Sequence, residues 1–215
     1  MRPAILSEGS LADAIHPTPC PRRVGGLFLN QTQPPFNNKK LRQALLHVVD
    51  QREVVAAVLG EQARYAKLPV GYFTVGSPFA SDAGMAALTG PRDLANARAL
   101  VQESGYAGEP VLLMSPSDQP QMHTMAALCD NMFKKLGIAV TSVTTDWGTL
   151  LTRRSVTKPA ADGGWNAFNS RITGLGGADP TSVQLCANGA KAWFGWPDIP
   201  ELERLREAWF RAPTL

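Results

Sequence analysis

Apolar residues recur with helical spacing soon after two consecutive prolines, and this is the clearest pattern in the chain. They lie at positions i, i+3, i+4, i+7 and i+8, which correspond to Leu41, Ala44, Leu45, Val48 and Val49. Such spacing places them on one stripe of an α-helix. Pro34 and Pro35 disfavour helix before this stripe, and Asn37 or Asn38 suits the N-cap. The pattern therefore predicts a short amphipathic helix with a well-marked start.

A second short helix is predicted directly after the first. Asp50 and Glu53 have the spacing of an acidic capping box, and Gly60 suits the position after the last helical turn. The apolar residues of this helix are Val54, Val55, Val58 and Leu59. His47 and Asp50 are three residues apart, but capping and core packing account for this run better than catalysis does.

Residues 110–145 have the pattern of a strand, a helix and a second strand. An apolar run at 110–115 predicts a buried strand, residues 120–136 predict a helix that ends at Gly137, and 138–145 predict the next strand. The apolar side of the helix comprises Met122, Met125, Ala126, Cys129, Phe133 and Leu136. This order implies a crossover between parallel strands, with the methionines and Cys129 packed in the core.

The remaining predicted elements are short and are separated by turns. We expect strands at 25–30 and 165–172, and helices at 92–104 and 147–155. Residues 60–90 are expected to be irregular, and loops of this length often carry function. The last helix is predicted to start near Pro200, with Asp198 as its cap and with Leu202, Leu205 and Trp209 buried.

Composition excludes several classes of protein but does not indicate a single function. The 215 residues are 44% hydrophobic and 18% charged, which is enough to bury a full core. A net charge of +3 is too mild to indicate nucleic-acid binding. Cys20, Cys129 and Cys186 are odd in number and widely spaced, so neither a disulfide framework nor a zinc site is expected. The chain contains no apolar run of ~20 residues, and residues 1–30 lack the pattern of a secretory leader.

No motif for bond chemistry stands out. The sequence contains no GxSxG, HExxH or phosphate-binding loop, and His16, His47 and His123 are isolated, so we expect no catalytic residue, metal or cofactor. Large rings gather instead after residue 160, where Trp165, Trp193, Trp196 and Trp209 lie. Aromatic walls with a few polar groups are typical of binding clefts, although core packing explains Trp209 better.

One family resemblance covers nearly the whole chain. Residues 29–53, LNQTQPPFNNKKLRQALLHVVDQRE, resemble the signature of the dipeptide, oligopeptide and nickel family (family 5) of extracytoplasmic solute-binding proteins, the receptors of ABC importers. The resemblance continues through five shorter segments, namely DLANARALVQESGY at 93–106, LGI at 136–138, DWGTL at 146–150, WN at 165–166 and AWFGWPDIPELERLREAW at 192–209.

The resemblance implies a fold and a mode of action. The fold is α/β, a class II periplasmic-binding-protein-like lobe with a mixed sheet flanked by helices. Residues 25–215 correspond to the second lobe, and residues 1–24 are expected to be poorly structured or a remnant of the first. Because family members are considerably longer, the chain is expected to be a fragment. The implied ligand is a peptide or related small solute, held by closure of two lobes and delivered in the periplasm to ABC permease subunits.

The resemblance also places a site. In the family's peptide binders an acid after the strand equivalent to 165–172 pairs with the peptide amino terminus, and here the nearby acid is Asp179, in a turn that is shorter and richer in glycine. Phe168, Asn169, Arg171 and Thr173 are expected at the cleft edge, with Arg171 suited to bind a carboxylate. Trp193 completes the set of expected ligand-binding residues.

Two other classes of function remain open at this point. One is an α/β enzyme with an unrecognised site, which a nucleophile and base within hydrogen-bond reach near Arg171 and Asp179 would favour. The other is an interaction module derived from a truncated receptor. An exposed, concave apolar face would support the missing first lobe, whereas a sealed polar surface would argue that the chain is complete.

Overall fold

The computed structural model describes residues 23–213, so the prediction for the N-terminal segment lies outside the described residues except at Arg23 and Val24, which belong to the first strand. The strands are β1 (Arg23–Leu29), β2 (Val111–Pro116), β3 (Val140–Thr145) and β4 (Ala167–Thr173). The helices are α2 (Lys39–Leu46), α3 (Gln51–Leu59), α4 (Ala86–Thr89), α5 (Leu94–Glu103), α6 (Pro120–Lys135), α7 (Trp147–Arg153) and α8 (Pro200–Phe210). The 3₁₀ turns are η1 (Gly60–Tyr65), η2 (Ala160–Asp162), η3 (Leu175–Gly177), η4 (Val183–Leu185) and η5 (Gly189–Lys191).

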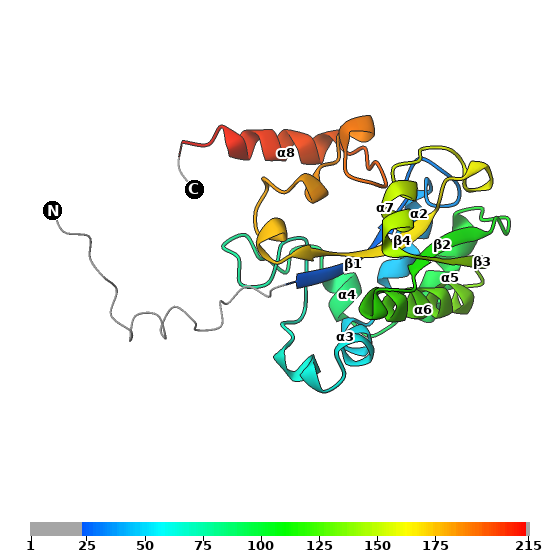
Figure 1. Ribbon diagram of the computed structural model, residues 1–215. Helices are drawn as coiled ribbons and strands as arrows, with labels where there is room; N and C mark the ends of the chain where they lie inside the picture. Colours follow the sequence, from blue (N-terminus) through cyan, green and yellow to red (C-terminus); the bar gives the residue numbers. More distant parts are fainter. Residues whose placement is uncertain (1–22, 214–215) are drawn as a thin grey trace.

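The four strands form one mixed sheet in the order β1-β4-β2-β3. β2 is parallel to both β3 and β4, which confirms the predicted parallel pair joined through α6. β1 runs antiparallel to β4, so that Arg23 lies opposite Thr173 and Leu29 lies opposite Ala167. Figure 1 shows α6 and α7 on opposite sides of this sheet. The architecture confirms the predicted α/β lobe with a mixed sheet flanked by helices.

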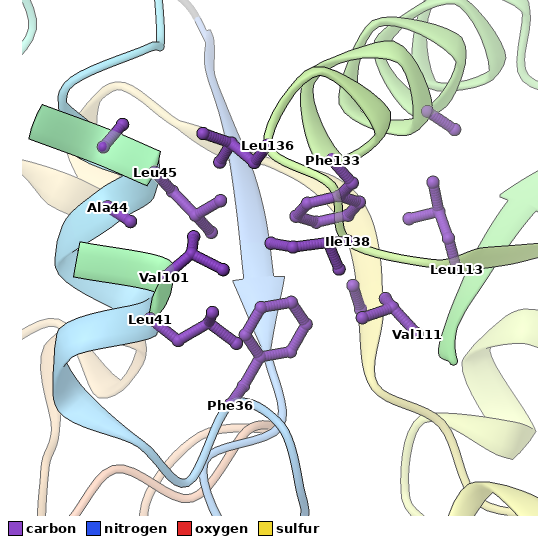
Figure 2. Packing of buried hydrophobic residues seen from close by; sticks show 13 residues of the cluster. Phe36, Leu41, Ala44, Leu45, Val101, Val111, Leu113, Phe133, Leu136 and Ile138 are labelled. Carbon is purple, nitrogen blue, oxygen red and sulfur yellow. The ribbon is translucent and has the colours of Figure 1, made fainter. Parts of the chain in front are cut away.

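The larger core lies between the sheet and the helices α2, α5 and α6 (Figure 2). Leu41, Ala44 and Leu45 of the predicted stripe are buried there, and Phe36 packs on Phe133 with ring centroids 5.7 Å apart. Figure 2 shows both rings between α2 and the strand residues Val111 and Leu113. The amphipathic pattern therefore identified the buried side of α2, because that side faces a sheet and two other helices.

A smaller aromatic core lies on the other face of the sheet. Trp165 and Phe168 are both fully buried and meet edge to face at 4.9 Å between centroids. Met114 and Leu150 complete the buried part of this cluster, and Trp196 packs on Trp165 from a later loop. Alternation along β4 thus directs Phe168 to this core, whereas Asn169 points to the α6 side, where it contacts Cys129.

Two predicted N-caps are present, but the last helix differs from its prediction. Asn38 and Asp50 each accept two backbone N–H groups at the starts of α2 and α3. At α8 the N-cap is Ile199 without a side-chain bond, so the predicted cap at Asp198 is wrong. Leu205 is 52% exposed, and the buried residue of this helix is Arg206. The helical stripe could not predict this, because the loop that contacts α8 offers carbonyl oxygens to a buried guanidinium.

Candidate functional site

Arg171 lies where β4 approaches the start of α6. Its guanidinium donates to the side-chain oxygen of Gln121 at 2.8 Å and to that of Gln119 at 3.3 Å. Both acceptors are neutral, and no carboxylate in residues 23–213 forms an ion pair with Arg171. The edge of the sheet therefore holds an oriented positive charge that has no counter-ion among the described residues.

Two further groups, Arg23 and the N-terminus of α6, make this edge positive. Burial and, secondly, repulsion from the positive charge of Arg23 lower the pKa of Arg171 from its ordinary value. Arg23 belongs to the neighbouring strand β1 and lies opposite Thr173. The N-terminus of α6, with its partial positive charge, begins at Pro120, between the two glutamines that bind Arg171. The arrangement suits a carboxylate or another anion.

The turn after β4 is built from small, closely packed residues. The Thr173 hydroxyl accepts the backbone N–H of Gly176 at 3.0 Å. Thr74, from the long irregular segment between α3 and α5, donates its hydroxyl to the Gly174 carbonyl at 2.8 Å. A Cβ added at Gly177 would come within 2.8 Å of the Ile172 side chain and 3.0 Å of the Thr74 hydroxyl. A side chain at 177 would therefore force the Ile172 and Thr74 side chains to move, because two segments meet closely at this position.

Asp179 follows this turn and has a local structural role. One carboxylate oxygen accepts the backbone N–H of Thr181 at 2.7 Å, as in an Asx turn. Asp179 and Arg171 form no ion pair with each other. The second carboxylate oxygen of Asp179 accepts no hydrogen bond from residues 23–213, so it is available to a ligand on this half-buried turn.

Phe168 and Asn169 lie inside the sheet and expose no surface. Phe168 stacks on Phe28 with centroids 5.2 Å apart. The Asn169 side-chain oxygen accepts the Cys129 thiol at 3.5 Å, while its amide nitrogen is buried without a hydrogen-bond partner in the described residues. Neither side chain reaches the surface in this structure, so their place is beneath the edge that Arg171 and Thr173 form.

Trp193 lies at the other end of the sheet. Its segment is joined to the end of β1 through the Gln31 N–H, which donates to the Gly195 carbonyl at 2.8 Å. The Trp193 ring meets Phe194 at 4.9 Å, and the Arg154 guanidinium lies 5.4 Å from the ring centroid. Arg171 follows Ala167, at this end of β4, by four residues, so about 13 Å of strand separate the two positions. The structure does not bring Trp193 together with the other predicted residues.

One serine–histidine contact bears on the enzyme alternative. Ser115 on β2 and His123 on α6 lie 2.9 Å apart, between the hydroxyl oxygen and the ring Nδ1. Ser115 is only 4% exposed, so a substrate does not reach its hydroxyl in this structure. In residues 23–213 no group hydrogen-bonds the other ring nitrogen of His123, as the orienting residue of a catalytic triad would. The contact is therefore best explained as packing between α6 and the sheet.

Other sites are also limited within the described residues. No group of three or more His, Cys, Asp or Glu side chains within residues 23–213 is placed to hold a metal ion. Across the same residues, no helix has both the length and the apolar character needed to cross a membrane.

The sequence predictions missed four residues of the candidate site, namely Gln119, Gln121, Arg23 and Thr74. A usable signal existed for the glutamines, because they follow β2 at the carboxyl edge of parallel strands, where ligands usually bind.

A small mixed α/β sheet with helices on both faces, ending in a charged edge outside the strand ends, is the architecture of a periplasmic-binding-protein lobe. The chain belongs to the bacterial extracellular solute-binding proteins, family 5, whose middle region matches residues 11–193. It is 33% identical over 190 residues to a probable peptide ABC transporter periplasmic-binding protein of Sinorhizobium fredii. That alignment spans 88% of this chain but 36% of the relative.

Solved structures agree on the fold. The substrate-binding protein CtaP of Listeria monocytogenes superposes with a TM-score of 0.73 at 20% identity, over 88% of this chain and 37% of that one. The murein tripeptide binding protein MppA of Escherichia coli also gives 0.73 at 18% identity, over 92% and 38%. At these identities the likeness shows the fold alone. The chain therefore spans well under half the length of the relatives it matches.

Proposed function

We propose that residues 25–215 act as the second lobe of a periplasmic solute-binding protein that delivers peptides or related small solutes to an ABC permease. The main support is the similarity, at 33% identity over 190 residues, to a relative described as a peptide ABC transporter periplasmic-binding protein. In two-lobed receptors a ligand is bound between lobes that close by hinge motion, without bond chemistry. Because Arg23 and Val24 belong to β1, the proposal counts them with this lobe and leaves residues 1–22 as a separate N-terminal segment.

Exposed apolar side chains support a partner lobe against which this lobe closes. Tyr72, Leu175, Val183, Leu205 and Phe210 are between 49% and 81% exposed. Tyr72 and Leu205 also line an apolar depression of ≈ 280 Å³, together with residues that include Phe73, Leu185 and Trp209. Large exposed apolar groups concentrated on one region are typical of interaction surfaces. Leu175 and Val183 lie in the turns that follow β4, and Leu205 and Phe210 lie on α8.

Arg171, Thr173 and Asp179 are the proposed ligand-contacting residues. Arg171 offers an uncompensated guanidinium to a ligand carboxylate, and Asp179 offers a free carboxylate oxygen to a ligand amino group. Thr173 holds the turn between them through Gly176. A peptide or amino-acid derivative carries both of the complementary charges.

The test is an NMR titration of the 215-residue chain with trialanine. We expect weak, saturable shifts of the backbone amides at 171–179, since one lobe supplies only part of a cleft. Arg171→Gln should weaken binding about tenfold, as expected when one charged hydrogen bond is lost. Arg98→Gln is the matched control, because Arg98 also binds a neutral acceptor, the Lys135 carbonyl at 2.9 Å, at the far end of α6.

The outcome is decisive in either direction. Unchanged binding in Arg171→Gln, or shifts that lie outside residues 171–179, would contradict the assignment of this edge. Arg171→Gln and Asp179→Ala should also leave the thermal unfolding midpoint close to that of the parent chain. A fall as large as that of a core truncation would show that these residues are structural.

A further inference from the structure

A polar cavity of ≈ 520 Å³ lies at the opposite end of the sheet from Arg171. Its lining includes Gln31, Gln33, Asn37, Arg42, Trp196 and Asp198. Its volume falls within the range of about 300–1,000 Å³ that is usual for small-molecule sites. None of the residues proposed to contact the transported solute lines it. The cavity is therefore a separate feature of the molecule.

Hydrogen bonds hold the walls of the cavity in place. Asn30 is fully buried, donates its amide to the Trp165 carbonyl at 3.0 Å and accepts the Thr32 hydroxyl at 2.7 Å. Gln33 donates its side-chain amide to the Thr157 carbonyl at 3.2 Å, which joins the segment after β1 to the loop after α7. Gln31 donates its backbone N–H to the Gly195 carbonyl at 2.8 Å, which joins the same segment to the loop that contains Trp196. Such a preformed site loses little conformational entropy when it binds a ligand.

The aromatic wall is placed by a tight backbone approach. A Cβ at Gly195 would lie 2.5 Å from the Leu29 carbonyl oxygen, so only glycine fits at that position. The next residue, Trp196, has φ of 49°, the left-handed region that a bulky residue rarely adopts. Its ring packs on Trp165 at 5.8 Å between centroids, and Trp196 is one of the residues that line the cavity. The chain thus accepts an unfavourable conformation that places an indole at this wall.

The polar groups in the walls include both donors and acceptors. Asp198 forms no ion pair or side-chain hydrogen bond with any residue in 23–213, and its carboxyl lies 3.6 Å from the Cβ position of Gly189. Arg42 uses one guanidinium nitrogen to bind the Phe36 carbonyl at 2.6 Å, so its other donors remain for a ligand. One acid and one base leave the lining without net charge. Side-chain amides from Gln31 and Asn37 supply further donors and acceptors.

We propose that this cavity is a binding site for a neutral, hydroxyl-rich solute of one or two sugar rings. Hydroxyl groups both donate and accept, which matches the carboxylate, guanidinium and amides of the walls. The apolar face of a sugar ring matches the indole of Trp196. A ligand with a net charge has no such match, because the lining carries one charge of each sign. A zwitterionic peptide is the competing ligand, and a shift of the Trp196 signal with trialanine would favour it over a sugar. The inference does not depend on the proposed transport function.

The test is an NMR titration of the full chain with maltose and, separately, with glucose. We expect saturable shifts of the Trp196 indole N–H and of the Gln31 and Asn37 side-chain amides. Asp198→Asn should weaken binding about tenfold or more, because a hydrogen bond to a charged acceptor is lost. Asp82→Asn is the matched control, since Asp82 is an exposed acid outside the cavity. Trialanine should leave the Trp196 signal unchanged.

Three results would overturn the proposal. The first is the absence of saturable shifts with either sugar up to about 50 mM, since that excludes even millimolar affinity. The second is equal sugar affinity in Asp198→Asn and Asp82→Asn. The third is a set of shifts centred on residues 171–179, which would assign the sugar to the other end of the sheet. Failure of trialanine to bind affects only the transport proposal.

Discussion

Replacing Arg206 with alanine tests how α8 is attached to the rest of the lobe. The Arg206 side chain is 10% exposed and forms an ion pair with Glu203 at 2.8 Å. It also donates to the Pro180 carbonyl at 3.0 Å and to the Ser182 carbonyl at 3.4 Å. Burial opposes its charge, but the hydrogen bond and charge of Glu203, with a contribution from Cys186, raise the pKa of Arg206 above its ordinary value. One side chain therefore connects α8 to the loop after β4.

The magnitude follows from what remains after truncation. Arg206→Ala leaves two carbonyl groups and a carboxylate without their donor, although Glu203 is 25% exposed and keeps the Ala187 N–H at 2.6 Å. Breaking a fully buried pair costs about 3–5 kcal/mol, and water can reach part of this one. We therefore expect a loss of about 2–3 kcal/mol in the free energy of unfolding.

Arg204 provides a matched control on the same helix. It pairs with Glu201 at the same i,i+3 spacing as the Arg206 pair. The distance is 2.6 Å, but the Arg204 side chain is 64% exposed. Arg204→Ala should leave the urea unfolding midpoint close to that of the parent chain, because an ion pair in water contributes little to stability. Hydrogen exchange should show faster exchange across α8 only in Arg206→Ala. Equal effects of the two substitutions on unfolding and on exchange would refute the role assigned to Arg206.

Three further predictions concern the core, a buried thiol and the serine–histidine contact. Leu41→Ala, at a residue with no exposed surface, should lower the free energy of unfolding by about 3 kcal/mol, whereas Leu46→Ala, 42% exposed, should cost less than about 1 kcal/mol in the same urea titration. Burial raises the pKa of the Cys129 thiol from 9.0 to about 11. The unfolded chain therefore loses this proton at a lower pH than the folded chain does. As the pH rises from 9.0 to about 11, ionisation of Cys129 should lower the free energy of unfolding, and the urea midpoint of Cys129→Ala should fall less over this range than that of the parent chain. Hydrolysis of p-nitrophenyl acetate should not exceed that of Ser115→Ala, and a clear excess would revive the enzyme alternative.

Local signals in the sequence predicted most of the elements. Asn38 and Asp50 were recognisable as caps because a cap bonds backbone groups only two or three residues away. The strand, helix and strand around α6 were recognisable because periodicity and Gly137 act within a single element. The buried stripe of α2 was correct up to Leu45. The helix then ends at Leu46, so that Val48 and Val49 fall outside it.

The site was predicted only in part, for reasons of long-range geometry. Arg171 was expected at a strand end and lies there, but its partners Gln119 and Gln121 are 52 and 50 residues away in sequence. Phe168 was expected at the surface, and the aromatic core on the α7 side of the sheet buries it instead. Trp193 was grouped with Arg171 because both follow residue 160, yet the chain crosses to the far end of β4 before reaching it.

The sequence by itself determined most of the helices, the caps at Asn38 and Asp50, the parallel strand pair and the family to which the chain belongs. These depend on contacts within a few residues or on a long run of matched positions. Only the tertiary structure decided that Arg206 is buried in place of Leu205, and that Trp196 faces a cavity at the opposite end of the sheet from Arg171. Such facts depend on which distant segments meet, and spacing along the chain does not encode that.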